Sequence, residues 1–252
     1  MDIRPLRKEF LESAAAGKVL PLSAEIDGVK LPPLAALGAF RPLGHAVLLE
    51  SVRVHETIGR YSFVSADPYL IFCSRGESVD LHWTVAPRGK YGKHATVTRK
   101  PLAKLRDLMA NYRTVRPPHL PPFTGGAVGF FSYDFVRQIE KVPQKAADDL
   151  NIPESCFLFV DLVVAYDHVL NKAWLIVNPG AREQEMGFRK PAPDEWGRLY
   201  DDAVGRMEWA AGVLEAAHPA APSHHAPRDA GAVVIEPNMP RARFESMVRQ
   251  AK

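Results

Sequence analysis

The sequence predicts a mixed α/β (α+β) fold. Short strand-like segments are separated by turn residues, helical runs carry apolar residues at three- and four-residue spacing, and one long run is almost continuously apolar. Hydrophobic residues make up 46% and charged residues 24% of the 252 residues, the balance of an ordinary globular protein.

Strand-like segments fill much of the first hundred residues. A strand over 45–51 and another over 60–65 are expected to pair as a hairpin across the loop at 52–59. The run 156–166 is apolar except for Asp161, which is typical of a single strand buried on both faces. The other expected strands are 19–26, 69–74, 78–85, 93–99 and 173–177.

Helices are expected where apolar residues recur on one face and a suitable residue stands at an end. Gly17 suits the position after a helix, Pro101 suits a first turn, and Asp194 is a candidate N-cap. The expected helices are 6–16, 33–40, 101–112, 195–214 and one that opens at 240.

Composition divides the chain into three parts. Residues 1–215 read as one domain, 216–237 as a linker rich in Ala, Pro and His, and 238–252 as the first helix of a further domain. The linker histidines have no Cys or carboxylate at ligand spacing, so a tether is expected rather than a metal site. Because the last helix carries no stop signal, we expect a chain cut in mid-helix.

Several classes of function are excluded. The net charge of +3 is spread out, without a basic stripe that would bind nucleic acid. No apolar run approaches the ~20 residues of a membrane span, and no signal peptide opens the chain, so a cytoplasmic protein is expected. Cys73 and Cys156 stand alone in strand-like runs, so we expect two unpaired thiols and no metal site.

Few residues suggest chemistry by themselves. Glu50 and Ser51 end a strand, where they could meet an ammonium group and a polar edge of a small ligand, or simply turn into solvent. Arg60 could form a structural ion pair with Glu50 across the hairpin. The glycines at 125, 126 and 129 lack the pattern of a phosphate loop, so close backbone approach or a bulge is expected there.

Four segments, in order, resemble one enzyme family. They are L-L-E-S at 48–51, G-R-Y-S-F at 59–63, G-G-A-V-G-F-F-S-Y-D at 125–134 and D-L-V-V-A-Y-D-H at 161–168. Together they are similar to anthranilate synthase component I, the large subunit. The resemblance implies the N-terminal part of the layered helix–sheet–sheet–helix fold of anthranilate and aminodeoxychorismate synthases.

The resemblance implies a regulatory site for L-tryptophan, the feedback inhibitor. The L-L-E-S segment contributes to this site in the family, and in aminodeoxychorismate synthases the residues around G-R-Y do so as well. No catalytic or metal-binding residue can be carried over. The implied effector residues are Leu48, Leu49, Glu50, Ser51, Ile58, Gly59, Arg60 and Tyr61.

The family converts chorismate and ammonia, or glutamine, to anthranilate and pyruvate in tryptophan biosynthesis. The resemblance implies that its Mg²⁺ is held by a chorismate-binding half missing from this sequence. It further implies a glutamine amidotransferase partner, component II. The chain alone is therefore expected to be inactive and to hold no cofactor. Two alternatives stay open: the same region of aminodeoxychorismate synthase component I in the folate pathway, or a standalone, non-catalytic tryptophan-binding module.

Overall fold

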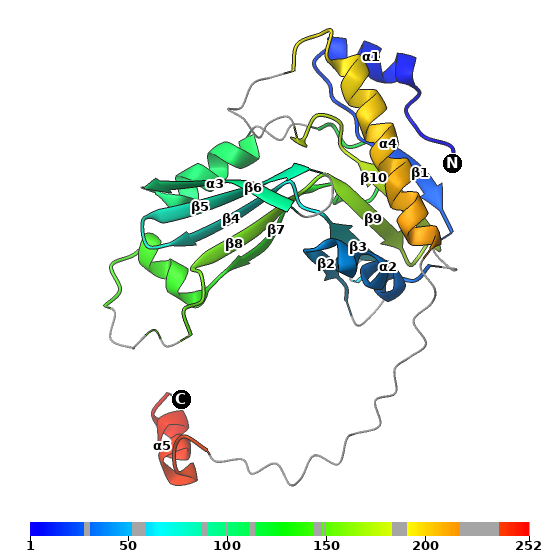
Figure 1. The fold of residues 1–252 in the computed structure, drawn as a ribbon. Coiled ribbons are helices and arrows are strands. Elements are labelled where there is room, and N and C mark those ends of the chain that lie inside the picture. Colours follow the sequence, from blue (N-terminus) through cyan, green and yellow to red (C-terminus); the bar gives the residue numbers. More distant parts are fainter. Residues whose placement is uncertain are drawn as a thin grey trace. The chain divides into compact units, whose positions relative to one another are not determined.

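A computed structural model gives the fold of the chain. The structure describes residues 1–27, 31–51, 59–86, 90–98, 100–110, 114–143, 148, 150–182, 191–216 and 237–251. Residues 1–219 form one compact unit and residues 220–252 a second. The mixed α/β class is confirmed, with two antiparallel sheets and helices in the first unit (Figure 1).

The first sheet joins strands that are distant in sequence. Its order is β1-β10-β9-β3-β2, and every neighbouring pair is antiparallel. The expected hairpin partners at 45–51 and 60–65 do pair, although the first of them is shorter than expected. The strands are β1 (Leu22–Ile26), β2 (Ala46–Leu49), β3 (Tyr61–Ala66), β9 (Leu162–Asp167) and β10 (Lys172–Val177).

The second sheet has the order β6-β5-β4-β8-β7 and is also antiparallel throughout. Its first three strands form the meander expected from the turn residues that separate them. The strands are β4 (Leu70–Arg75), β5 (Ser78–Ala86), β6 (Lys90–Thr98), β7 (Gly126–Phe131) and β8 (Ser155–Val160).

Three apolar clusters give the order of the layers. Helices α1 (Arg7–Ala15), α2 (Pro33–Phe40) and α4 (Trp196–Glu215) pack on one face of the first sheet. Side chains from both sheets meet in a second cluster, which includes Phe63 of β3 and Leu158 of β8. Helix α3 (Pro101–Ala110) covers the far face of the second sheet. The expected helix–sheet–sheet–helix layering is therefore confirmed.

The apolar run 156–166 is two strands rather than the single expected one. β8 ends at Val160, β9 begins at Leu162, and the two strands belong to different sheets. Asp161 lies between them with its carboxylate buried against two arginines. The chain also passes between the sheets at Asp67, between β3 and β4. A buried aspartate therefore lies at each of these two crossovers.

The expectation of two unpaired thiols was wrong. Cys73 of β4 and Cys156 of β8 are directly opposite in the ladder and form a disulfide, with their Cα atoms 4.2 Å apart. The two cysteines are 83 residues apart in sequence, so no local spacing could reveal the pair.

Two glycine expectations are confirmed and one capping expectation is not. Gly17 follows α1 with φ of +76° and donates to Ala14, as a C-terminal glycine does. A Cβ atom at Gly129 would overlap the backbone of Cys156 and Phe157, so close strand approach requires glycine there. Asp194 is not the cap of α4, which begins at Trp196 with Glu195 in the capping position.

The chain also contains two short 3-10 helices and one further α-helix. The 3-10 turns are η1 (Arg41–Leu43) and η2 (Tyr133–Gln138). Helix α5 (Arg241–Ala251) belongs to the second unit and leaves Phe244 and Met247 more than half exposed, at 57% and 51%. Among the described helices, none is both long enough and apolar enough to cross a membrane.

Candidate functional site

The implied effector residues gather at the open edge of the first sheet. Leu48 and Leu49 end the edge strand β2, and Leu49 lies opposite Phe63 of β3. Glu50 and Ser51 follow directly and are exposed. Gly59, with φ of +71°, and Arg60 lead into Tyr61, the first residue of β3. Ile58 lies outside the described residues.

Strand alternation divides these residues between two faces. Leu48 lies opposite Val64 and belongs to the core beneath the helices. Leu49 is on the other face, where it is 41% exposed. The Tyr61 ring stacks on Phe63 with ring centroids 6.0 Å apart, on the same face as Leu49. An exposed leucine and a partly exposed tyrosine therefore border the segment that carries Glu50 and Ser51.

Arg60 forms its ion pair with Asp167 rather than with Glu50. Its Nε and Nη2 atoms donate to the two carboxylate oxygens, the shortest contact being 2.6 Å. The Arg60 guanidinium also lies 5.1 Å from the centre of the Tyr61 ring. Asp167 additionally accepts hydrogen bonds from the amides of Val169 and Leu170, which fixes the turn after β9.

The electrostatics of this pair follow from its burial. Burial opposes ionisation of Asp167, but the hydrogen bond from Arg60 and the two turn amides outweigh it and hold the pKa of Asp167 below its usual range. Beside the pair, Ser62 Oγ lies 2.7 Å from His168 Nε2. Because Arg60 contacts both Asp167 and the Tyr61 ring, it fixes Tyr61 relative to the β9–β10 turn.

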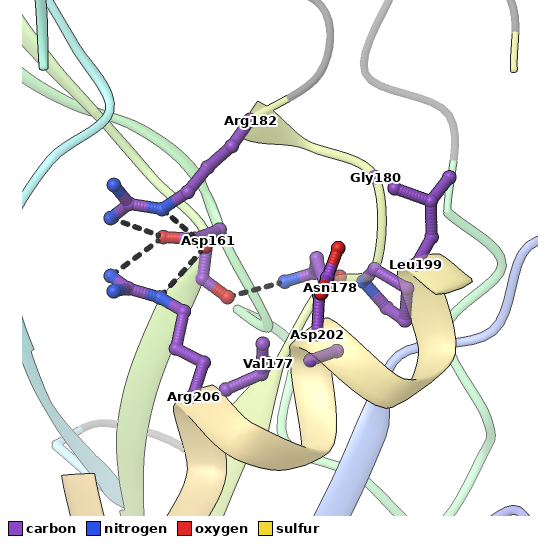
Figure 2. Close-up of a pocket in the computed structure, with 10 residues that line it drawn as sticks. Asp161, Val177, Asn178, Gly180, Arg182, Leu199, Asp202 and Arg206 are labelled. Atoms are coloured by element: carbon purple, nitrogen blue, oxygen red, sulfur yellow. Dashed lines mark hydrogen bonds and ion pairs between the residues drawn. The ribbon is translucent and has the colours of Figure 1, made fainter. Parts of the chain in front are cut away.

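A second polar site lies at the crossovers between the sheets. Asp67 and Asp161 have side chains that are 0% and 3% exposed, and both contact Arg182 and Arg206. Figure 2 shows the two guanidinium groups approaching Asp161 from Arg182, beyond β10, and from Arg206 on α4. We call these four residues the crossover cluster.

The crossover cluster is balanced in charge. Burial opposes ionisation of Asp161, but the charges of Arg182 and Arg206 outweigh it, so its pKa lies below the usual range. Two carboxylates face two guanidinium groups, so the cluster offers little net charge to a ligand. Its arrangement suits a structural role: Arg206 of α4 and Arg182, after β10, bind the aspartates at both crossovers and so link these parts of the chain.

A small open cavity of about 130 Å³ adjoins the cluster. Asn178 lines it and donates to the backbone oxygen of Asp161 (Figure 2). It also donates to the backbone oxygen of Thr124. The Oδ1 atom of Asn178 is buried and has no hydrogen-bond partner among the described residues. The cavity has room for water to satisfy that acceptor. Its volume suits solvent better than an amino-acid ligand.

The crossover cluster was not predicted from the sequence. One signal was present, since Asp161 interrupts an otherwise apolar run, and a buried charge requires a partner. The partners Arg182 and Arg206 follow 21 and 45 residues later, so spacing could not identify them. In the described part of the chain, no three His, Cys, Asp or Glu side chains come together to hold a metal ion.

Comparison with known proteins gives the family of the chain. A family model described as chorismate binding enzyme matches residues 67–252. Anthranilate synthase component 1 of Acetivibrio thermocellus is 32% identical over 160 residues, which cover 64% of this chain and 31% of that protein. The protein of the same name from Mycobacterium tuberculosis H37Rv is 33% identical over 212 residues, covering 80% of this chain and 37% of its own.

A solved structure supports the same fold. The crystal structure of anthranilate synthase component I from Streptococcus pneumoniae TIGR4 matches with a TM-score of 0.52 and 19% sequence identity. The match covers 80% of this chain and 39% of that one. The chain thus spans about a third of the length of the curated relatives named above.

Proposed function

Because the chain belongs to the chorismate binding enzyme family, we propose that it supplies the tryptophan-sensing, regulatory part of an anthranilate synthase component I. The relatives named above support this choice, since they bear that name. One observation carries the proposal: the exposed Glu50 and Ser51 directly follow the edge strand β2, whose last residue, Leu49, lies on the same face as the Tyr61 ring.

The chemistry of that surface suits an aromatic amino acid. Leu49 and Tyr61 offer apolar contact to an indole ring, and Glu50 offers a carboxylate to an ammonium group. Ser51 adds a hydroxyl that can donate or accept a hydrogen bond. Arg60 acts in this proposal by fixing Tyr61, because its donors are directed to Asp167.

Inhibition would then work by linkage. A ligand can shift the enzyme only by the difference in its affinity for two conformations, so tryptophan must bind the inactive one more tightly. β3 carries Tyr61 at one end and leads to Asp67 of the crossover cluster at the other. The proposed site and the crossover cluster are therefore joined by one strand.

The activity of the whole enzyme is part of the same proposal. It comprises conversion of chorismate, with ammonia or glutamine, to anthranilate and pyruvate in tryptophan biosynthesis. In this proposal Mg²⁺ serves the whole enzyme, and this chain matches about a third of the length of the relatives named above. An amidotransferase, component II, would deliver the ammonia.

Calorimetry on the 252-residue chain tests the site. L-Tryptophan is expected to bind with a stoichiometry of one, and Ser51→Ala to weaken binding about tenfold, the effect of losing one good hydrogen bond. Ser78→Ala, in β5 of the second sheet, is the matched control and should bind as the unaltered chain does. Absence of binding heat, or equal weakening by both variants, would contradict the proposed site.

A further inference from the structure

The paired cysteines of the second sheet provide a site that the proposed function does not use. Cys73 of β4 and Cys156 of β8 are directly opposite in an antiparallel ladder, with a Cα–Cα distance of 4.2 Å. Directly opposed residues come this close at the non-hydrogen-bonded positions of such a ladder. The backbone alone therefore brings the two sulfur atoms together.

The ladder holds the cysteines in register whether or not they are bonded. β4 and β8 pair continuously from Leu70 opposite Phe159 to Ser74 opposite Ser155. The buried hydroxyls of Ser74 and Ser155 are 2.7 Å apart, one residue from the cysteines. Reduction of the disulfide therefore does not require the strands to separate. Re-oxidation does not require a large movement of the chain, because the two cysteines stay opposite each other.

Solvent can reach this part of the sheet. Leu70, Phe72 and Phe159 point to the face covered by α3, so Cys73 and Cys156 point to the other face. Both cysteines are only partly buried. Phe130 of β7, opposite Cys156 on the same face, is 46% exposed. Accessible disulfides exchange with small thiols more readily than buried ones.

We propose that Cys73 and Cys156 form a reversible thiol–disulfide exchange site for small disulfides such as oxidised glutathione. In the forward direction, one cysteine thiolate attacks the glutathione disulfide, forming a mixed disulfide and releasing one glutathione thiolate. The second cysteine then attacks the protein sulfur and releases the second glutathione. The protein dithiol is oxidised by two electrons, and one glutathione disulfide is reduced to two thiols.

Alkylation followed by mass spectrometry of the intact, folded chain tests this site. After reduction with dithiothreitol, iodoacetamide is expected to label two thiols. After incubation with oxidised glutathione it should label none, with no glutathione retained, and renewed dithiothreitol should restore both labels. Two persistent labels, two retained glutathiones, or a disulfide that native dithiothreitol leaves intact would each overturn the proposal.

Single variants supply an independent measurement. Cys73→Ser and Cys156→Ser each leave one thiol without its resolving partner, so each should retain one glutathione. Since the disulfide closes a chain segment of 83 residues, oxidation should raise the Tm of the unaltered chain by roughly 5–15 °C and leave both variants unchanged. Equal Tm values for the oxidised and reduced unaltered chain would contradict a bond within one folded molecule.

Discussion

Replacement of Arg206 by methionine is the sharpest test of the crossover cluster. The Arg206 side chain is 11% exposed, its Nη1 lies 2.9 Å from Asp67 Oδ2, and its Nε lies 2.9 Å from Asp161 Oδ2. Methionine keeps much of the apolar length of the side chain beside Trp209. The substitution therefore removes the charge and the hydrogen-bond donors with little change in packing.

The expected loss in the free energy of unfolding depends on the charges that remain in the crossover cluster. After the substitution, the two buried carboxylates keep their contacts with Arg182, which is 24% exposed, but lose the second guanidinium. Removal of one partner from a buried ion pair destabilises proteins by about 3–5 kcal/mol. Arg182 still compensates one carboxylate, so we expect the lower end, ~3 kcal/mol in the free energy of unfolding.

Urea denaturation followed by tryptophan fluorescence measures this cost at pH 7. Arg198→Met is the matched control, because it lies on the same helix in an exposed pair with Asp202. Exposed pairs of this kind contribute little, so the control should lose less than ~0.5 kcal/mol. A loss below ~1 kcal/mol for Arg206→Met would refute the view that this arginine holds the two crossovers.

The difference should also depend on pH. The pKa of Asp161 is held below its usual range in the folded chain, so the stability it contributes is present above the unfolded pKa. That contribution is lost as the pH falls through the folded pKa. The unaltered chain and Arg206→Met should therefore converge in stability below about pH 4, near the ordinary aspartate pKa. A constant difference down to acid pH would contradict the ionic origin of the effect.

Three further substitutions test other contacts. Gly129→Ala should lower the free energy of unfolding, measured by denaturant, by roughly 3 kcal/mol or more, because its Cβ would overlap the backbone of β8. The control Gly205→Ala, with open space around it, should leave that free energy unchanged or raise it by up to ~1 kcal/mol. Tyr166→Phe should be neutral or stabilise by ~1 kcal/mol, since its buried hydroxyl has no partner among the described residues; a large loss would reveal one. Asp167→Asn should lower the Tm at pH 7, and this loss should shrink as the pH falls from about 4 through the folded pKa, which is held below the usual range, whereas the exposed Asp134→Asn should change the Tm little throughout.

Local pattern was sufficient for most elements, whereas the order of the layers was implied by the family resemblance. Alternation and turn residues placed the meander, and apolar spacing placed α3 and α4, because these signals act within a few residues. Local pattern could not show that the run 156–166 contains two strands, because β8 and β9 are equally apolar although they belong to different sheets. Only the arginines at 182 and 206, outside any local window, explain why the chain changes sheets at Asp161.

For the candidate site, the sequence predicted the segments that contribute to it but not the distant residues that they contact. The pairing of the strands that carry these segments follows from local pattern, and the structure contains it, with 46–49 opposite 63–66. The partner of Arg60 is 107 residues away, and the partner of Cys73 is 83 residues away. Such pairings depend on strand order across the whole sheet, which a single sequence does not reveal.

The strand order of the first sheet also has a consequence for how the chain folds during synthesis. Residue 22 pairs with residue 177, and β3 is enclosed only when β9 arrives almost a hundred residues later. A ribosome adds residues at about 5–20 per second, so this delay lasts ~5–20 s. Until then β2 and β3 can pair only with each other within this sheet, and a two-stranded hairpin is marginally stable in water. The apolar side chains of β3 that later contact β9 therefore stay exposed for seconds while the protein is being made.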